Sequence, residues 1–193
     1  MGKICYIMGK SSSGKDSIFK MLKEKMPELK DIILYTTRPA RAGETDGAEY
    51  HFVDEDRLKV MEEKGCVIEL REYNTKHGVW KYFTADDGQI DLNKHDYIVI
   101  GTLESYTAMC SYFGKEKLIP VYIQVEDGLR LERALFRERA QDEPRYSEMC
   151  RRFLADEADF SEENLKKAGI EKRFVNNKIE DCIEEIYNYL QKK

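Results

Sequence analysis

Apolar positions along the chain fall into two patterns. Runs of strand length in which nearly every residue is apolar occur at 4–8, 32–34, 97–100 and 118–125. Apolar residues at helical spacing instead mark the stretches at 17–22, 104–113, 129–139, 160–167 and 179–190. Strands without a polar face are typical of a parallel sheet that is covered by helices. The pattern therefore predicts an α/β fold of three layers, with helices on both faces of a central parallel sheet.

The segment between the second and third of these strands has a different pattern. Residues 35–53 are rich in Thr, Pro and Gly, which is typical of a loop. Asp54 is a predicted N-cap for a helix over 54–64, with Leu58, Val60 and Met61 as its apolar residues. The remaining predicted elements are a strand over 66–70, a short helix over 85–92 and a last strand over 173–175.

A glycine-rich loop follows the first strand and leads into the first helix. Its residues are Gly9, Lys10, Ser11, Ser12, Ser13, Gly14, Lys15, Asp16 and Ser17. They match seven of the eight positions of G-x-x-x-x-G-K-[ST], the phosphate-binding loop, in its strand–loop–helix context. The glycines let backbone N–H groups turn toward phosphate oxygens, the helix adds the positive end of its dipole, and Lys15 adds a full charge. The loop predicts a nucleotide phosphate site; a Ser- and Gly-rich turn that happens to contain lysine is the alternative.

The eighth position of the motif holds Asp16 where serine or threonine is expected, and Ser17 follows one residue late. A carboxylate is a hard oxygen ligand, so Asp16, together with Ser17, is a candidate ligand of Mg²⁺. The same carboxylate would repel phosphate when no metal is bound. Both effects of Asp16 stay open from the sequence.

Composition narrows the function classes. The chain has 193 residues, of which 36% are charged and 41% hydrophobic, and this balance suits one compact domain with inserted subdomains. The net charge of −5 argues against general binding of nucleic acid or of anionic membranes. No apolar run reaches membrane-spanning length, and no signal peptide is recognisable. The five cysteines are scattered without metal-binding spacing, so we expect reduced thiols in a cytoplasmic protein.

Two groups of arginines are candidates for phosphate chemistry. Arg38 and Arg41 lie in the loop over 35–53, where their guanidinium groups suit an anion clamp. Arg133 and Arg137 share one face of a predicted helix, and Arg152 lies in the next helix, beyond a break at 141–144. Phosphoryl transfer needs cations around the transferring group, and a mobile lid can deliver them on closure. A solvated basic loop and a solvated charged helix are the respective alternatives.

The loop after the second strand resembles the acceptor site of guanylate kinases. That family carries a Ser-Thr-Thr-Arg-x-Pro-Arg-x-Gly-Glu run followed by Gly-x-x-Tyr-x-Phe. This chain keeps Thr36, Thr37, Arg38, Arg41, Gly43, Glu44, Gly47, Tyr50 and Phe52. It has Tyr35 where the family usually has serine, and its proline comes one place early, at Pro39.

The resemblance implies roles for particular residues. Contacts to the acceptor's phosphate are implied for Arg38, Arg41, Tyr50 and Tyr82, with Tyr35 in the same GMP site. Contacts to the guanine are implied for Glu69 and Thr84, and an adenine contact for Asn176. The lid positions of the family match Arg133, Arg137 and Arg152, which with Lys15, Arg38 and Arg41 form the implied catalytic set.

The chain also departs from the family's pattern. Guanylate kinases end the third core strand with Asp-x-Asp-x-x-Gly, and the corresponding residues here are Ile100, Thr102 and Ser105. The hydroxyl of Thr102 can still touch the base, whereas Ile100 cannot serve a metal. Phe83 also replaces the usual glycine. The missing carboxylates and the Gly-Lys-Asp-Ser ending of the loop resemble the ribosyl bisphosphate kinases.

We therefore predict ATP- and Mg²⁺-dependent phosphorylation of a nucleoside monophosphate, GMP first, with small-molecule nucleotides as partners. Two alternatives stay open: a kinase for another phosphorylated acceptor such as ribose 1,5-bisphosphate, and a non-catalytic guanylate-kinase-like binding module. The predicted organisation is a core at 1–34, 85–125 and 156–193, an acceptor-binding insert at 35–84 and a lid at 126–155.

Overall fold

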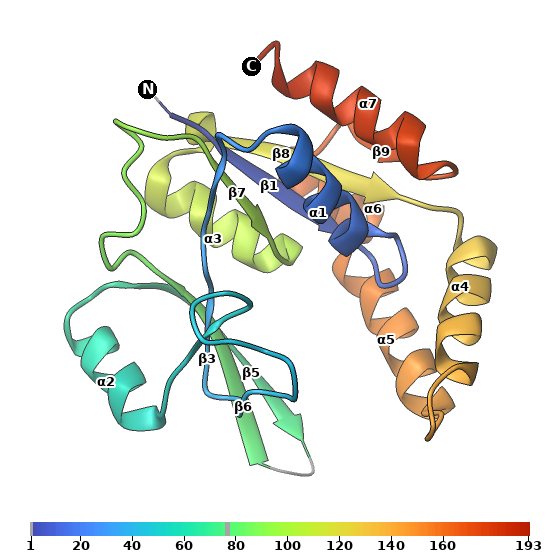
Figure 1. The fold of residues 1–193 in the computed structure, drawn as a ribbon, viewed down its shortest axis with the longest axis horizontal. Coiled ribbons are helices and arrows are strands. Elements are labelled where there is room, and N and C mark those ends of the chain that lie inside the picture. Colours follow the sequence, from blue (N-terminus) through green and yellow to red (C-terminus); the bar gives the residue numbers. More distant parts are fainter. Residues whose placement is uncertain (1, 76–77) are drawn as a thin grey trace.

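The computed structural model describes residues 2–75 and 78–193, and a five-stranded parallel sheet lies at its centre (Figure 1). The strand order is β2-β7-β1-β8-β9. In that order the strands span Lys30–Asp31, Tyr97–Ile100, Ile4–Gly9, Leu118–Gln124 and Arg173–Val175. Every residue of β1 is buried, and β1 pairs in parallel with β7 on one side and with β8 on the other. The prediction of a central parallel sheet is confirmed.

Helices cover both faces of this sheet (Figure 1). The helices on one face are α1 (Lys15–Lys25) and α7 (Ile179–Leu190), and those on the other are α3 (Leu103–Phe113) and α6 (Glu162–Lys167). Side chains of β1 alternate between the two faces: Cys5 and Ile7 join the apolar cluster under α1 and α7, and Tyr6 joins the cluster under α3 and α6. Burial on both faces explains why β1 has no polar residue.

A smaller sheet with the order β4-β3-β6-β5 forms a second lobe. Its strands are β4 (His51–Phe52), β3 (Tyr35–Thr36), β6 (Gly78–Ala85) and β5 (Val67–Thr75), and α2 (Glu55–Glu63) packs beside them. Asp54 caps α2 as predicted, because its side chain accepts a hydrogen bond from the backbone N–H of Arg57. Leu58, Met61 and Phe83 are buried in a core of this lobe's own.

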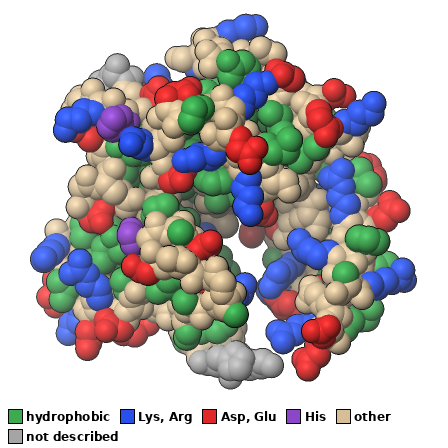
Figure 2. Space-filling model, in the orientation of Figure 1, with side chains coloured by type: hydrophobic (Ala, Val, Ile, Leu, Met, Phe, Trp, Pro, Cys, Tyr) green, Lys and Arg blue, Asp and Glu red, His purple; other side chains and the backbone are tan. Residues whose placement is uncertain are grey.

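Two long helices form the other side of the molecule. These are α4 (Asp127–Arg139) and α5 (Tyr146–Asp159), and a short 3₁₀ turn, η1 (Lys115–Lys117), precedes β8. In the space-filling view a gap separates α4 and α5 from the lobe of the smaller sheet (Figure 2). Lys and Arg side chains face this gap from the side of α4 and α5 (Figure 2). Across residues 2–75 and 78–193, none of the helices has the length and apolar character that crossing a membrane requires.

Several local predictions were wrong. Residues 32–34 are not a strand: the strand ends at Asp31, and the backbone N–H and C=O of Ile33 bond to the side chain of Gln89 instead. Residues 85–92 are not a helix, because Gly88 has φ +97° and Ala85 belongs to β6. Val60 is 39% exposed rather than part of the core of α2. The helix expected over 160–167 begins only at Glu162, where Ser161 caps it.

Candidate active site

The glycine-rich loop has the backbone that a phosphate site needs. Gly14 lies in the left-handed region, with φ +84°, and opens α1. A Cβ on Gly14 would lie 2.5 Å from Asn176 Nδ2, and a Cβ on Gly9 would lie 2.7 Å from the carbonyl oxygen of Ile123. Ser12 also has a positive φ, 62°, which non-glycine residues seldom adopt outside functional loops. The loop therefore has a constrained conformation, and replacing Gly9 or Gly14 by a residue with a Cβ would disturb it.

Lys15 and Asp16 occupy the first turn of α1. The Nζ of Lys15 lies 3.6 Å from Oδ2 of Asp16, whose side chain is 78% exposed. Ser17 is exposed as well. Within the described part of the chain, no group of three or more His, Cys, Asp or Glu side chains is placed to hold a metal ion. Mg²⁺ bound to a nucleotide takes only one or two carboxylates beside phosphate and water oxygens, so Asp16 fits this limited role.

Asn176 joins the end of the sheet to the loop. Its side chain is 97% buried, and its Nδ2 donates to the carbonyl oxygen of Ser13 at 2.8 Å. Its backbone N–H donates to Gln124 at the end of β8, and its carbonyl oxygen accepts from Nη2 of Arg133 at 3.2 Å. In this structure the amide of Asn176 thus holds the loop's backbone, a contact that the sequence did not indicate. An adenine contact by Asn176 stays a prediction.

A buried arginine that the sequence analysis missed connects the loop to α4 and α5. Arg130 is 1% exposed, and its Nε donates to the carbonyl oxygen of Ser11 at 3.1 Å. Its two Nη atoms reach Asp127 at 2.6 Å, Glu157 at 2.8 Å and Asp156 at 3.3 Å. Arg130 belongs to no motif. Its position on the buried face of α4 is the feature from which its role could have been predicted.

The loop makes two further contacts with α5. The backbone N–H of Ser11 donates to Oδ2 of Asp156 at 2.7 Å. The Nζ of Lys10 lies 2.6 Å from Oε1 of Glu157. Carboxylates of α5 therefore hold the start of the loop, and the position of α5 is coupled to that of the loop.

The predicted clamp arginines differ in their surroundings. Arg38 is 3% exposed, and its two Nη atoms donate to the carboxylate of Glu44 at 2.8 and 2.9 Å. This pair raises the pKa of Arg38 and lowers the pKa of Glu44 from 4.5 to about 2. The buried Nε of Arg38 has no hydrogen-bond partner within the described residues, and the side chain of Arg41 is exposed. Donors that an anion can reach thus remain on Arg41, whereas those of Arg38 are buried or bound to Glu44.

Aromatic residues surround this clamp. The guanidinium carbon of Arg38 lies 5.6 Å from the ring centre of Tyr50, and the rings of Tyr50 and Tyr82 are 5.7 Å apart. Tyr35 is buried; its ring stacks on Phe83 and its hydroxyl donates to Asp87. Burial and this bond raise the pKa of Tyr35. The structure therefore brings Tyr50 and Tyr82 to Arg38 and buries Tyr35 in the core of the lobe, against Phe83.

The predicted base contacts form a closed hydrogen-bond cluster. Glu69 Oε1 accepts from Thr84 Oγ1 at 2.7 Å and from Ser105 Oγ at 2.9 Å. Arg71 donates to Glu69 Oε2 through Nε at 2.9 Å and to Thr102 Oγ1 through Nη1 at 3.4 Å. Thr102 also caps α3, since its Oγ1 accepts from the backbone N–H of Ser105. The sequence analysis did not single out Arg71. Burial favours a lower pKa for Arg71, but the charge and the hydrogen bonds of Glu69 together outweigh burial and raise the pKa.

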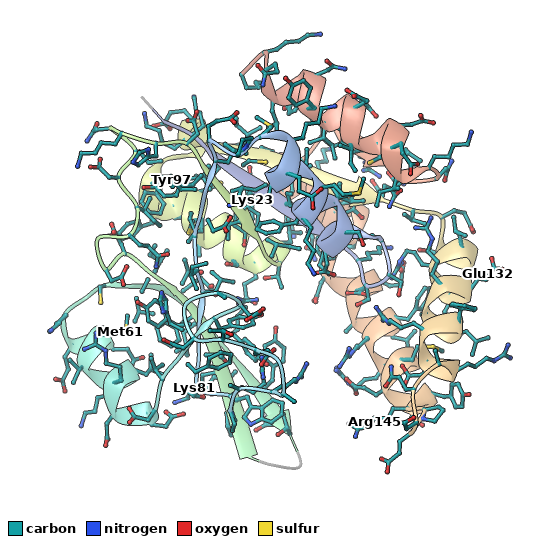
Figure 3. The ribbon with its side chains drawn as sticks, in the orientation of Figure 1. Lys23, Met61, Lys81, Tyr97, Glu132 and Arg145 are labelled. Carbon is teal, nitrogen blue, oxygen red and sulfur yellow. The ribbon has the colours of Figure 1, made fainter. Side chains whose placement is uncertain are left out.

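The lid arginines lie on α4 and α5. Arg133 is half-buried against Asn176, whereas Arg137 and Arg152 are exposed. Arg152 donates to Glu148 at 2.9 Å, and Arg151 donates to the same carboxylate, whose pKa falls to about 2. Figure 3 places Arg145 at the far end of these two helices, across the gap from Lys81 on β6.

Comparisons with known proteins agree with this architecture. A guanylate kinase from Rhodococcus jostii is 40% identical over 71 residues, which cover 37% of this chain and 34% of that protein. A guanylate kinase from Frankia casuarinae is 43% identical over 63 residues, which cover 33% of this chain and 34% of that protein. The matched stretch thus spans about a third of the length of these curated relatives.

Similarity of fold extends much further than these alignments. The crystal structure of guanylate kinase from Anaplasma phagocytophilum superposes with a TM-score of 0.67 at 19% identity, covering 98% of this chain and 85% of that one. The model of the guanylate kinase family matches residues 1–193. Because that match extends over the whole sequence, the chain belongs to the guanylate kinase family.

Proposed function

We propose that this chain transfers the terminal phosphoryl group of ATP to GMP, giving ADP and GDP. The observation that carries the proposal is the pairing of β1 and β7 as parallel neighbours, because their carboxyl ends then lie at the same edge of the sheet. The glycine-rich loop leaves β1 at this edge, and Thr102, beside Glu69 and Arg71, follows β7. Ligands of open α/β sheets bind at this edge, so donor and acceptor would meet there.

The loop would bind the phosphates of ATP. Its backbone N–H groups and the start of α1 stabilise negative charge, and Lys15 adds a cation at the outer phosphates. Asp16, with Ser17, would hold the Mg²⁺ that accompanies ATP, and this ion supplies charge neutralisation on the phosphate oxygens. Asn176 and Arg130 keep the loop in shape through the carbonyl groups of Ser13 and Ser11.

The acceptor would bind to the insert over 35–84. Arg41 offers exposed donors to the acceptor's phosphate, Arg38 adds a buried positive charge in the same loop, and the rings of Tyr50 and Tyr82 lie beside Arg38. Two anions held in line need no covalent intermediate, because positioning and neutralisation of charge provide most of the catalysis in phosphoryl transfer.

Closure of the lid over 126–155 would complete the site. Arg133, Arg137 and Arg152 lie on the two lid helices, and closure would bring their charge to the transferring phosphoryl group. The contacts of Asp156 and Glu157 with the glycine-rich loop give this motion a fixed base.

A coupled assay of ADP release with GMP, AMP and ribose 1,5-bisphosphate tests the proposal. We expect GMP to be the best acceptor. Lys15→Ala should lower turnover by about 100-fold or more, since a preorganised cation that faces transition-state charge is lost. Lys20→Ala, which removes an exposed lysine from the same helix, is the matched control and should leave turnover unchanged. Preference for ribose 1,5-bisphosphate would overturn the acceptor, and absence of turnover with every acceptor would overturn the kinase.

A further inference from the structure

Arg71 binds the carboxylate of Glu69, the residue that the proposed function places against the guanine. The two side chains form a buried pair, with exposed fractions of 11% for Arg71 and 6% for Glu69. Nε of Arg71 lies 2.9 Å from Oε2 of Glu69, and Nη2 lies 3.3 Å from Oε1, so the guanidinium spans both carboxylate oxygens. Thr84 and Ser105 also donate to Oε1. The carboxylate that the proposed function assigns to the base is therefore already bound on both oxygens.

Counting donors and acceptors shows what is left for a ligand. A carboxylate offers about four lone-pair positions. Three donors lie on Oε1 of Glu69 and one lies on Oε2, which leaves a single position on Oε2. Guanine would present two parallel donors, N1–H and the 2-amino group, and these need one position on each oxygen. Thr84 and Ser105 fill Oε1, and Arg71 adds a third donor there and takes one position on Oε2, so one of the two guanine donors is left without a partner on Glu69.

Arg71 itself offers donors in place of the blocked acceptors. A guanidinium carries about five N–H groups, and Arg71 uses three of them on Glu69 and Thr102. Arginine donors suit the 6-oxo group of guanine. The same donors would face the 6-amino group of adenine, donor against donor, which leaves polar groups unpaired and is strongly unfavourable.

We propose that Arg71 is a specificity-determining residue that makes the acceptor site select 6-oxopurine monophosphates without requiring a 2-amino group. GMP and IMP, which share the 6-oxo group and N1–H, are then comparable acceptors, and AMP is rejected. The proposal rests on the proposed function, because it takes Glu69 as the residue that faces the base.

The decisive measurement is kcat/KM for GMP, IMP and AMP with the unmodified protein. We expect GMP and IMP to agree within about tenfold, because the 2-amino group lacks a dedicated acceptor, and AMP to be poorer by about 100-fold or more. A preference for GMP over IMP of about 100-fold or more would overturn the proposal, because such a ratio requires a site that binds the 2-amino group. Absence of phosphorylation of all three would instead overturn the proposed function, so the two failures are distinguishable.

Two variants test the role of Arg71 directly. Arg71→Met keeps the length of the side chain and removes the donors that suit the 6-oxo group, while Thr84 and Ser105 still fill Oε1 of Glu69. The preference for GMP and IMP over AMP should therefore fall by about tenfold or more, the value of one hydrogen bond, and GMP and IMP should still agree within about tenfold. Glu69→Gln is the matched control: it removes the carboxylate and leaves Arg71 in place, so preference for 6-oxopurines over AMP should persist. An unchanged preference over AMP in Arg71→Met, or loss of that preference in Glu69→Gln, would contradict the assignment. Calorimetric binding of GMP, IMP and AMP gives the same comparison if Arg71→Met folds but turns over slowly.

Discussion

Arg130→Met should destabilise the fold and weaken nucleotide binding together. Arg130 is buried at the base of α4 and connects three carboxylates, from Asp127, Asp156 and Glu157, to the carbonyl oxygen of Ser11. Methionine fills similar volume but has no donor. The variant therefore leaves a buried carbonyl group unpaired and three carboxylates close together without their common cation.

The magnitude follows from how far each partner is buried. Removing one member of a buried ion pair typically costs about 3–5 kcal/mol of unfolding free energy. Asp127 and Glu157 are 49% and 36% exposed and can turn toward water, whereas Asp156 is 17% exposed and cannot do so readily. We therefore expect a loss of about 2–3 kcal/mol, below the usual range for a fully buried pair. For a domain of this size that corresponds to a fall in Tm of about 4–12 °C.

Urea unfolding and calorimetric titration with ATP together check this prediction. Arg151→Met is the matched control, because Arg151 lies on α5, is 63% exposed and pairs with Glu148 on the surface. An exposed pair contributes about 0–1 kcal/mol, so the control should stay close to the unmodified protein. ATP affinity should fall in Arg130→Met and not in Arg151→Met, since Arg130 alone of the two contacts the loop. Equal stabilities of the two variants would refute the reasoning.

Two further predictions concern Asn176, which holds the glycine-rich loop, and the ion pair between Arg38 and Glu44. Asn176→Ala should weaken the binding of ATP, GTP and inorganic tripolyphosphate by the same factor of about ten, because the amide of Asn176 holds the carbonyl group of Ser13 rather than a base. A loss of affinity for ATP alone, measured by calorimetry, would favour an adenine contact. The carboxylate of Glu44 has a lowered pKa of about 2, so its pair with Arg38 stabilises the fold above pH 4.5 and that contribution disappears as the pH falls toward 2. The difference in urea midpoint between the unmodified protein and Glu44→Gln should therefore be constant above pH 4.5 and shrink toward pH 2, and a difference independent of pH would contradict this assignment.

The sequence alone predicts the structure where one local feature, such as an apolar strand or a required glycine, determines it. The inner strands β1, β7 and β8 are apolar at nearly every position because both faces of the sheet are buried there. The glycines of the loop are required by left-handed backbone and by contacts closer than a Cβ permits. The stretch at 85–92 shows the limit: its aspartates suggest a helix start, but Gly88 with φ +97° and the side-chain bonds of Gln89 produce an irregular segment. There the bonds between Gln89 and the backbone of Ile33, which is distant in sequence, outweigh the local preference for a helix.

The residues that support the site were out of reach for a different reason. Arg130 bonds to Ser11 across 119 positions, Asn176 bonds to Ser13 across 163, and Arg71 reaches Thr102 across 31. Arg130 and Arg71 belong to no motif, and Asn176 is marked only as an implied adenine contact, so the bonds of these three side chains become evident only when the fold brings the partners together. Motif residues such as Lys15 are recognisable because the residues that form a phosphate-binding loop are neighbours in the sequence.

One departure from the family's pattern lies beside a side chain that no motif marks. In the sequence, the absence of carboxylates at Ile100 and Thr102 and the presence of Arg71 on a different strand look unrelated. In the fold, Arg71 lies between Glu69 and Thr102, and the hydroxyl of Thr102 accepts its third bond. A carboxylate at position 102 would compete with Glu69 for the same guanidinium and would bring a second buried negative charge beside the first. The neutral hydroxyl instead leaves one arginine paired with one carboxylate, so the cluster of Glu69, Arg71 and Thr102 carries no net charge and, in the proposed acceptor site, would present donors where the family's pattern implies acceptors.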